Sequence, residues 1–128
     1  MSYQAYLIIE TGIPFDHHAI FIETHEIGPQ SGHVFNVIGN IQNGMVYEEK
    51  SVKNPEDASA LSRKEKLGSV AVENYPRLVE VCKEVPVPKK QFQGAKRLYP
   101  GERIRRCQEW AAEAVVALGD AGVLVKEG

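Results

Sequence analysis

Runs of apolar residues separated by short polar stretches fill the first half of the chain. Four of these runs are rich in β-branched and aromatic side chains, which favour strands. The four runs are 3–10, 17–24, 33–40 and 44–51. The last two are joined through Asn43-Gly44, and Asn-Gly between apolar runs is a strong hairpin signal. The short connections predict an antiparallel meander of four strands.

The second half begins with a polar stretch and then turns apolar again. Residues 53–66 are polar and predict a surface loop, and the apolar run 66–72 predicts a fifth strand. A helix follows, because Asn74 is a typical N-cap and the residues after it repeat apolar positions at helical spacing. The prolines within 86–88 end this helix, and 89–101 has no clear period and predicts a loop.

A second helix is predicted from about residue 102 or 104 to Leu118, where Gly119 follows. Its inner face carries small and aliphatic residues, among them Cys107, and 122–127 predicts a short terminal strand or tail.

These elements predict an α+β fold, with an antiparallel sheet of about five strands and two main helices packed on it. Several strands are apolar on both faces, so we expect helices to cover much of the sheet. The length of 128 residues suits a single domain, 1–128.

Composition and charge narrow the class of protein. The formal net charge of −2 gives no reason to expect nucleic acid as a partner, and the basic runs Lys89-Lys90 and 103–106 suit solvated surface. No stretch approaches the roughly 20 apolar residues of a membrane span, and the N-terminus does not read as a signal peptide. Two cysteines without a secretion signal are typical of free thiols, so we expect a cytoplasmic domain.

The two cysteines differ in position. Cys82 lies in the middle of an apolar helical stripe, where packing explains it. Cys107 lies in the first turns of its helix, where the partial positive charge of a helix N-terminus favours a thiolate. Arg105 and Arg106, expected on the outer face, add positive potential nearby. The sequence therefore makes Cys107 a candidate nucleophile, with packing as the alternative.

A cysteine nucleophile needs a base, and the chain offers His17, His18, His25 and His33. His25 falls in a loop and suits solvent exposure. His17 and His18 are neighbours on one strand, so they point to opposite faces and at most one faces Cys107. Neighbouring strand residues do not chelate one ion, and no standard ligand set completes a site, so we expect no metal and no cofactor.

The stretches HHAIFIET, GHVFNVIG and CQEW together resemble the circularly permuted papain-like fold, whose members include the lecithin–retinol acyltransferase-like proteins. The series GHVFNVIGN, GMVYEE, VPVP and CQEW is also similar to small fungal proteins of unknown function of that type. In this group the histidine precedes the cysteine along the chain. The resemblance implies that Cys107 is the nucleophile and that His17 is the base, because Ala19 and Phe21 share its alternation. His18 then points away.

The resemblance also implies a polar residue on the next strand that orients the imidazole, and the chain offers His33 or Asn36. If the loop between these strands closes them as a hairpin, the numbers of paired residues sum to about 55. His33 then lies opposite Ile22, about 17 Å along the strand from His17, and Asn36 lies opposite Ala19, only about 7 Å away. We therefore predict Asn36 as the orienting residue.

Taken together, these residues predict a thiol-dependent hydrolase or acyltransferase. Its substrate would be an ester, thioester or amide of a small molecule or peptide, as in a biosynthetic pathway. Gln108 and the first N–H groups of the helix are candidates for the oxyanion hole, although Gln108 equally suits exposure. One alternative is acid–base rearrangement of a small metabolite by the same residues, as in an isomerase or cyclase. The other is a non-catalytic pocket that binds a ligand or peptide.

Overall fold

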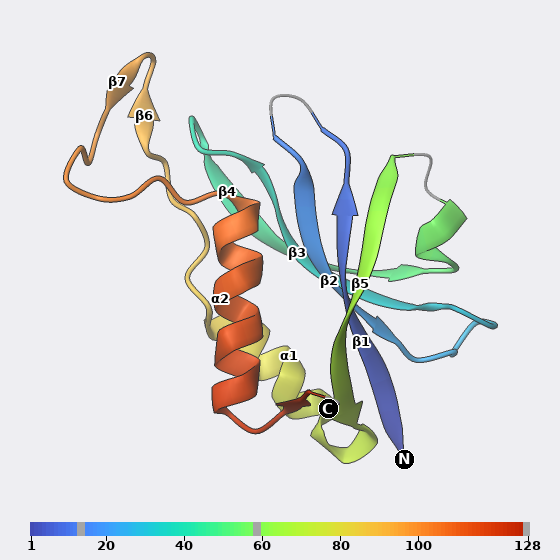
Figure 1. Cartoon of the computed structure of the whole chain (residues 1–128). Coiled ribbons are helices and arrows are strands. Elements are labelled where there is room, and N and C mark those ends of the chain that lie inside the picture. The colour runs from blue at the N-terminus through green and yellow to red at the C-terminus, as the bar shows by residue number, and fades with distance from the viewer. Residues whose placement is uncertain (13–14, 58–59, 127–128) are drawn as a thin grey trace.

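A computed structural model describes residues 1–12, 15–57 and 60–126. Residues 58–59 of the predicted surface loop and residue 127 of the predicted tail lie outside these ranges. Within them, the chain forms an α+β fold with one curled antiparallel sheet and two helices (Figure 1).

Six strands form the large sheet, in the order β4-β3-β2-β1-β5-β8, and every neighbouring pair is antiparallel. They are β1 (Ser2–Glu10), β2 (His17–Glu23), β3 (Gly32–Asn40), β4 (Gly44–Val52), β5 (Leu61–Ala71) and β8 (Leu124–Val125). The first four strands form the predicted meander, and each predicted bound lies within one residue of the observed one. The predicted terminal strand is β8.

The predicted loop at 53–66 is wrong for its last part, because β5 begins at Leu61. Its charged residues, 63–66, follow one another along a strand that pairs with β1, where Leu7 lies opposite Glu65 and Tyr6 opposite Lys66. Backbone pairing with β1 sets the conformation of this segment, and its polar side chains lie at or near the surface. A 3-10 helix (Pro55–Asp57) precedes it.

The two helices are α1 (Tyr75–Glu84) and α2 (Cys107–Asp120), and a 3-10 helix (Val72–Asn74) leads into α1. α1 begins directly after Asn74, as predicted. The predicted loop at 89–101 contains a small hairpin, formed by β6 (Phe92–Gln93) and β7 (Lys96–Arg97). Figure 1 shows this hairpin projecting beyond the end of α2.

The start of α2 was predicted three to five residues too early. Arg106 has an extended backbone, with φ −126° and ψ −169°, so the helix begins at Cys107. The cause is tertiary: the side chain of Gln91 holds the backbone of Arg105 in a non-helical position through two hydrogen bonds.

Both helices pack on the same face of the sheet (Figure 1). The core between the helices and the sheet includes Ile20, Ile22, Phe35, Val37 and Trp110. A second, smaller cluster lies on the opposite face of the sheet. Its buried members are Ile8, Ala19, Phe21 and Val34. The expected helical cover is thus confined to one face. Within the described parts of the chain, no helix has the length of apolar sequence needed to cross a membrane.

The pairing between β2 and β3 stops before the strands end, and this positions the pocket. The paired residues run from Glu23 opposite Gly32 to Ile20 opposite Phe35. β2 continues from there to His17 beside β1, and β3 continues to Asn40 beside β4. The sheet therefore splits into two hairpins at this end, which diverge in Figure 1.

Candidate functional site

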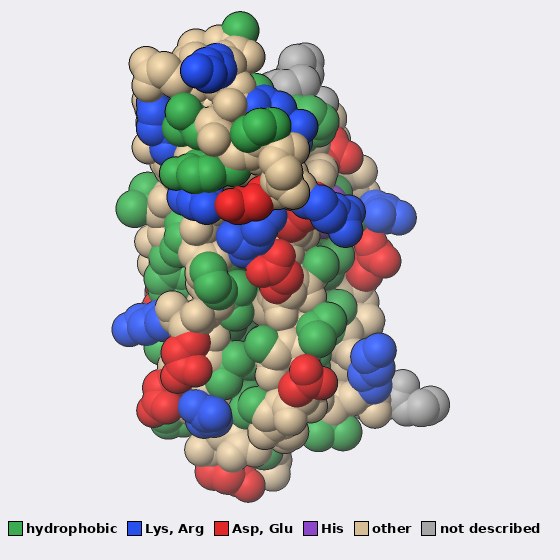
Figure 2. All heavy atoms as spheres, turned by 90° about the vertical axis from the view of Figure 1, so that its left-hand side faces the viewer, with side chains coloured by type: hydrophobic (Ala, Val, Ile, Leu, Met, Phe, Trp, Pro, Cys, Tyr) green, Lys and Arg blue, Asp and Glu red, His purple; other side chains and the backbone are tan. Residues whose placement is uncertain are grey.

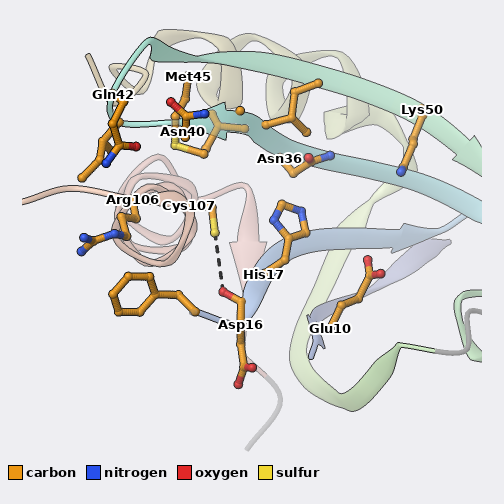
Figure 3. A pocket seen from close by; sticks show the side chains of 15 residues that line it. Glu10, Asp16, His17, Asn36, Asn40, Gln42, Met45, Lys50, Arg106 and Cys107 are labelled. Atoms are coloured by element: carbon orange, nitrogen blue, oxygen red, sulfur yellow. Dashed lines mark hydrogen bonds between the residues drawn. The ribbon is translucent and has the colours of Figure 1, made fainter. Parts of the chain in front are cut away.

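A pocket of about 690 Å³ lies at the split between β2 and β3. Its walls are residues 15–17, residues 36–42, residues 106–107, and the side chains of Glu10, Met45 and Lys50. The two hairpins supply two walls, and the start of α2 supplies a third. Figure 3 shows the side chains of Cys107 and His17 pointing into this pocket.

Cys107 is the first residue of α2 and is buried, with 8% of its surface exposed. Its thiol donates a hydrogen bond to the carbonyl oxygen of Asp16, with Sγ and O 3.8 Å apart (Figure 3). Asp16 directly precedes His17, so the first turn of α2 is anchored to the start of β2. The late start of the helix places Cys107 closer to the N-terminal partial charge than was predicted.

His17 is the first residue of β2, and its partner across the strands is Glu10. Burial lowers the pKa of its imidazole below the ordinary value of 6.5, against the opposing effects of Glu10 and Asn36, which raise it. Lys50 and His18 lower this pKa further. The imidazole is consequently neutral near pH 7 and can accept a proton.

Asn36 lies in the pocket wall on β3 and is 1% exposed. The predicted hairpin register is confirmed where the strands pair, since His33 lies opposite Ile22, but pairing ends at Ile20–Phe35 and the expected pair of Asn36 with Ala19 does not form. The Asn36 Nδ2 group donates to Oε1 of Glu48 at 3.3 Å. Its Oδ1 atom is buried and accepts no regular hydrogen bond from any described residue, yet the side chain lies close enough to His17 to raise the pKa of the imidazole by hydrogen bonding.

The nucleophile candidate and the base candidate approach the pocket from different faces of the sheet. Cys107 belongs to the helix-side core together with Ile20. Strand alternation places His17 with Ala19 and Phe21, which pack in the cluster on the opposite face. A continuous sheet would separate the two side chains. The split between β2 and β3 brings both into one pocket.

The other histidines lie outside the pocket walls. The Nε2 atom of His33 lies 3.1 Å from the carboxylate of Glu26, and its ring packs near Tyr75. The exposed ring of His25 bonds to Glu23. Gln108, a candidate for the oxyanion hole, donates its Nε2–H to the carbonyl of Asp16 at 3.2 Å. The Gln108 amide is thus occupied by the same acceptor as the Cys107 thiol.

Cys82 is fully buried between α1 and the sheet. Burial, with a smaller effect of the Glu49 charge, raises the pKa of its thiol to about 12. At neutral pH this thiol is protonated and packed, as its place in the helical stripe predicted.

The pocket residues that sequence reasoning did not assign to the site include Glu10, Lys50 and Arg106. Antiparallel pairing of the first two predicted strands contained a signal for Glu10, which lies opposite His17. The prediction that Arg106 lies on the outer face of a helix is wrong. It precedes α2 and lines the pocket, and its guanidinium carbon lies 4.0 Å from the centre of the Phe15 ring.

No cluster of three or more potential metal ligands occurs among the residues that the structure describes.

Comparisons with known proteins give one family. No curated protein and no solved structure matches the chain. The model of a family of unknown function, DUF6540, matches residues 5–125, and the chain therefore belongs to this family.

Proposed function

We propose that the protein is a cysteine-dependent hydrolase or acyltransferase, with Cys107 as nucleophile, His17 as general base and Asn36 as the residue that orients the imidazole. The observation that carries the proposal is the shared pocket. A thiol at the first residue of a helix and a neutral imidazole line the same cavity, although they belong to different faces of the sheet.

The chemistry follows from these positions. The Cys107 thiol passes its proton to the imidazole of His17, and Sγ attacks the carbonyl carbon of the substrate. The imidazolium returns the proton to the leaving oxygen, nitrogen or sulfur, and a thioester to Cys107 remains. Water then releases the acid, or an alcohol or amine takes the acyl group. In either case His17 removes the proton of the attacking group.

The N-terminus of α2 supports this reaction in two ways. Its partial positive charge stabilises the developing thiolate. The Arg106 side chain at the N-cap is a donor and offers no acceptor to the first N–H groups of the helix, and the capping bond that forms there runs from the backbone N–H of Arg106 to Oε1 of Glu109. The backbone N–H groups of the first turn are therefore the oxyanion donors in this proposal, in place of the occupied Gln108 amide.

Asn36 suits an orienting role because its amide is fixed at one end. The bond from Nδ2 to Glu48 leaves Oδ1 as the free acceptor for an imidazole N–H. A neutral amide stabilises an imidazolium less than a carboxylate does, and the charge of Glu10 beside His17 supplies part of the difference.

The thiol must leave its hydrogen bond to Asp16 before it can transfer its proton to His17. Hydrogen bonds of catalytic groups often tighten only when substrate is bound. The chain order of histidine before cysteine, with the cysteine opening a helix, also agrees with the resemblance to the permuted papain-like enzymes. That fold relationship is part of the proposal.

The test is acyl transfer from an activated ester. The protein is incubated with p-nitrophenyl acetate, the reaction is stopped with acid, and intact mass and peptide mass spectra are recorded. We expect one acetyl group on Cys107, absent in Cys107→Ala and formed much more slowly in His17→Gln. Cys82→Ser serves as the matched control and should acylate like the wild type. Two results would contradict the proposal and favour a non-catalytic pocket. One is acetylation of lysines while Cys107 stays unmodified, and the other is a rate of Cys107 acetylation that is unchanged in His17→Gln.

A further inference from the structure

Positive charge is concentrated in one part of the chain, the segment of residues 89–106. It holds seven of the 15 basic residues and one of the 17 acidic ones. This basic segment therefore carries six net positive charges, and the rest of the chain carries eight net negative ones. The net charge of −2 conceals this separation.

The basic segment lies beside the pocket. The backbone N–H of Gln91 donates to the carbonyl of Ile41 at 2.7 Å, and Nζ of Lys90 donates to the carbonyl of Gln42 at 2.9 Å. Ile41 and Gln42 both belong to the pocket wall. Figure 2 shows Lys and Arg side chains gathered in the upper part of this face of the molecule, where the segment lies.

Among the described residues, two cations of the basic segment are paired with carboxylates. Arg105 forms a bidentate pair with Glu113, and Lys89 pairs with Glu102. The guanidinium of Arg106 forms no ion pair with any carboxylate that the structure describes, and Arg106 differs from the other basic residues of the segment because it lines the pocket. It lies over the ring of Phe15 and in the pocket wall. An aromatic ring holds the planar group in place and leaves its N–H groups available.

The carboxylates in the pocket walls do not neutralise Arg106. Glu10 is the cross-strand partner of His17 on the hairpin of β1 and β2. The carboxylate of Asp16 accepts a hydrogen bond from the backbone N–H of Gly12 and points away from Cys107 (Figure 3). The carboxylate of Glu109 accepts a hydrogen bond from the backbone N–H of Arg106, and the guanidinium of Arg106 supplies a positive charge in the pocket wall next to Cys107.

We propose that the pocket takes acyl substrates that carry a negatively charged group, a carboxylate or a phosphate, and that Arg106 is the specificity-determining residue. This inference rests on the proposed function and names the substrate class for it. Arg106 directly precedes Cys107 in the chain. An anionic group bound by Arg106 would therefore be separated by only a few substrate bonds from the carbonyl that Sγ attacks. The basic segment raises the local concentration of anions at the mouth of the pocket.

Two alkylating reagents of nearly the same size test this charge preference. Iodoacetate is an anion and iodoacetamide is neutral, and in both reactions Sγ displaces iodide from the CH₂ group. The rate constants for Cys107 are measured by peptide mass spectrometry, and their ratio is compared between variants. A change in thiol ionisation affects both reagents equally and cancels in this ratio.

We expect Arg106→Gln to lower the ratio of iodoacetate to iodoacetamide rates by about tenfold, because it removes a charge-assisted contact. Arg103→Gln removes an equal charge farther along the same segment and should change the ratio far less. Melting temperatures of both variants check that the fold is kept. If Cys107 reacted with neither reagent, the proposed function itself would be overturned. A reactive Cys107 whose ratio is the same in wild type and Arg106→Gln would overturn the anion preference alone.

A second arm separates the two kinds of anion. Propionate and inorganic phosphate are each added as protectants during alkylation by iodoacetamide. The anion that protects Cys107 at the lower concentration identifies carboxylate or phosphate as the preferred group, and this protection should be lost in Arg106→Gln. Protection that is equal in wild type and Arg106→Gln, or absent with both anions, would contradict the assignment of Arg106.

Discussion

The side chain of Gln91 holds the backbone of Arg105 from both sides. Its Nε2–H donates to the carbonyl oxygen of Arg105 at 2.7 Å, and its Oε1 accepts from the N–H of Arg105 at 2.9 Å. Gln91 is itself buried, at 8% exposure. These two hydrogen bonds hold Arg105 in a non-helical position just before α2. They thereby fix where Arg106 and Cys107 lie.

Gln91→Ala should therefore loosen the start of α2. The change leaves both partly buried backbone groups of Arg105 without their partner, which costs about 1–3 kcal/mol of unfolding free energy. Urea unfolding measures this loss, and the alkylation rate of Cys107 should change with it. Gln93→Ala, at an exposed position of the same hairpin, is the matched control. Equal effects of the two substitutions would show that Gln91 does not position the site.

Asn36→Ala should lower acylation of Cys107 by at least about tenfold, because the imidazole loses the group that orients it. His33→Ala should leave the rate within about twofold. His33 bonds to Glu26 and lies outside the pocket walls. The p-nitrophenyl acetate assay compares the two variants, and melting temperatures exclude unfolding as the cause. A larger loss in His33→Ala would reverse the assignment of the orienting residue.

The lowered pKa of His17 predicts the pH dependence of the reaction. A base with a pKa below 6.5 stays unprotonated in mildly acidic solution, so the acid limb of the rate profile should lie below pH 6.5. Glu10 raises the pKa of His17, so Glu10→Gln should lower it and move the limb to still lower pH. NMR titration of the histidine ring protons measures this pKa directly. An upward shift in Glu10→Gln would contradict the arrangement.

The same lowered pKa predicts a change in stability with pH. Between the folded pKa and the unfolded value of 6.5, the unfolded chain binds the proton more readily than the folded protein. The contribution of neutral His17 is thus complete above pH 6.5 and is lost as the pH falls toward the folded pKa. His17→Gln should remove this part of the pH dependence, as urea unfolding of both proteins between pH 7.5 and about 5 can show.

Cys82→Ser should lower stability by about 1–3 kcal/mol without changing acylation of Cys107. The substitution puts a hydroxyl into a fully buried apolar position. Cys82→Ala, which adds no polar group, should cost less than Cys82→Ser. Chemical denaturation gives both values. If Cys82→Ser kept wild-type stability but the protein could no longer be acylated, the chemistry would belong to Cys82 and not to Cys107.

The strands and the hairpin register followed from local signals, and the errors occurred where distant residues decide the structure. Apolar runs and the Asn43-Gly44 turn predicted four strands whose bounds are nearly those observed. The start of β5 was missed because pairing with β1 overrides its polar composition. The start of α2 was missed because it depends on Gln91, which lies fourteen residues before its bonding partner Arg105.

The candidate site was predicted only in part, for a similar reason. Cys107 was named from its helix position, His17 from the resemblance to the permuted papain-like fold, and Asn36 from that resemblance together with the hairpin register, and all three line the pocket. Alternation alone, however, places Cys107 and His17 on different faces of the sheet. They share a pocket because two neighbouring strands separate, and no local pattern in either strand records where pairing stops.

The split between β2 and β3 also sets how quickly backbone amides exchange with solvent. In each strand, every second N–H points toward a given neighbour, and beyond the pair Ile20–Phe35 those groups have no partner strand there. Such amides should exchange with deuterium orders of magnitude faster than the paired amides of residues 32–35. A bound substrate that spans the split would slow them. The middle of this sheet thus offers its own reporter of occupancy, independent of any reaction at Cys107.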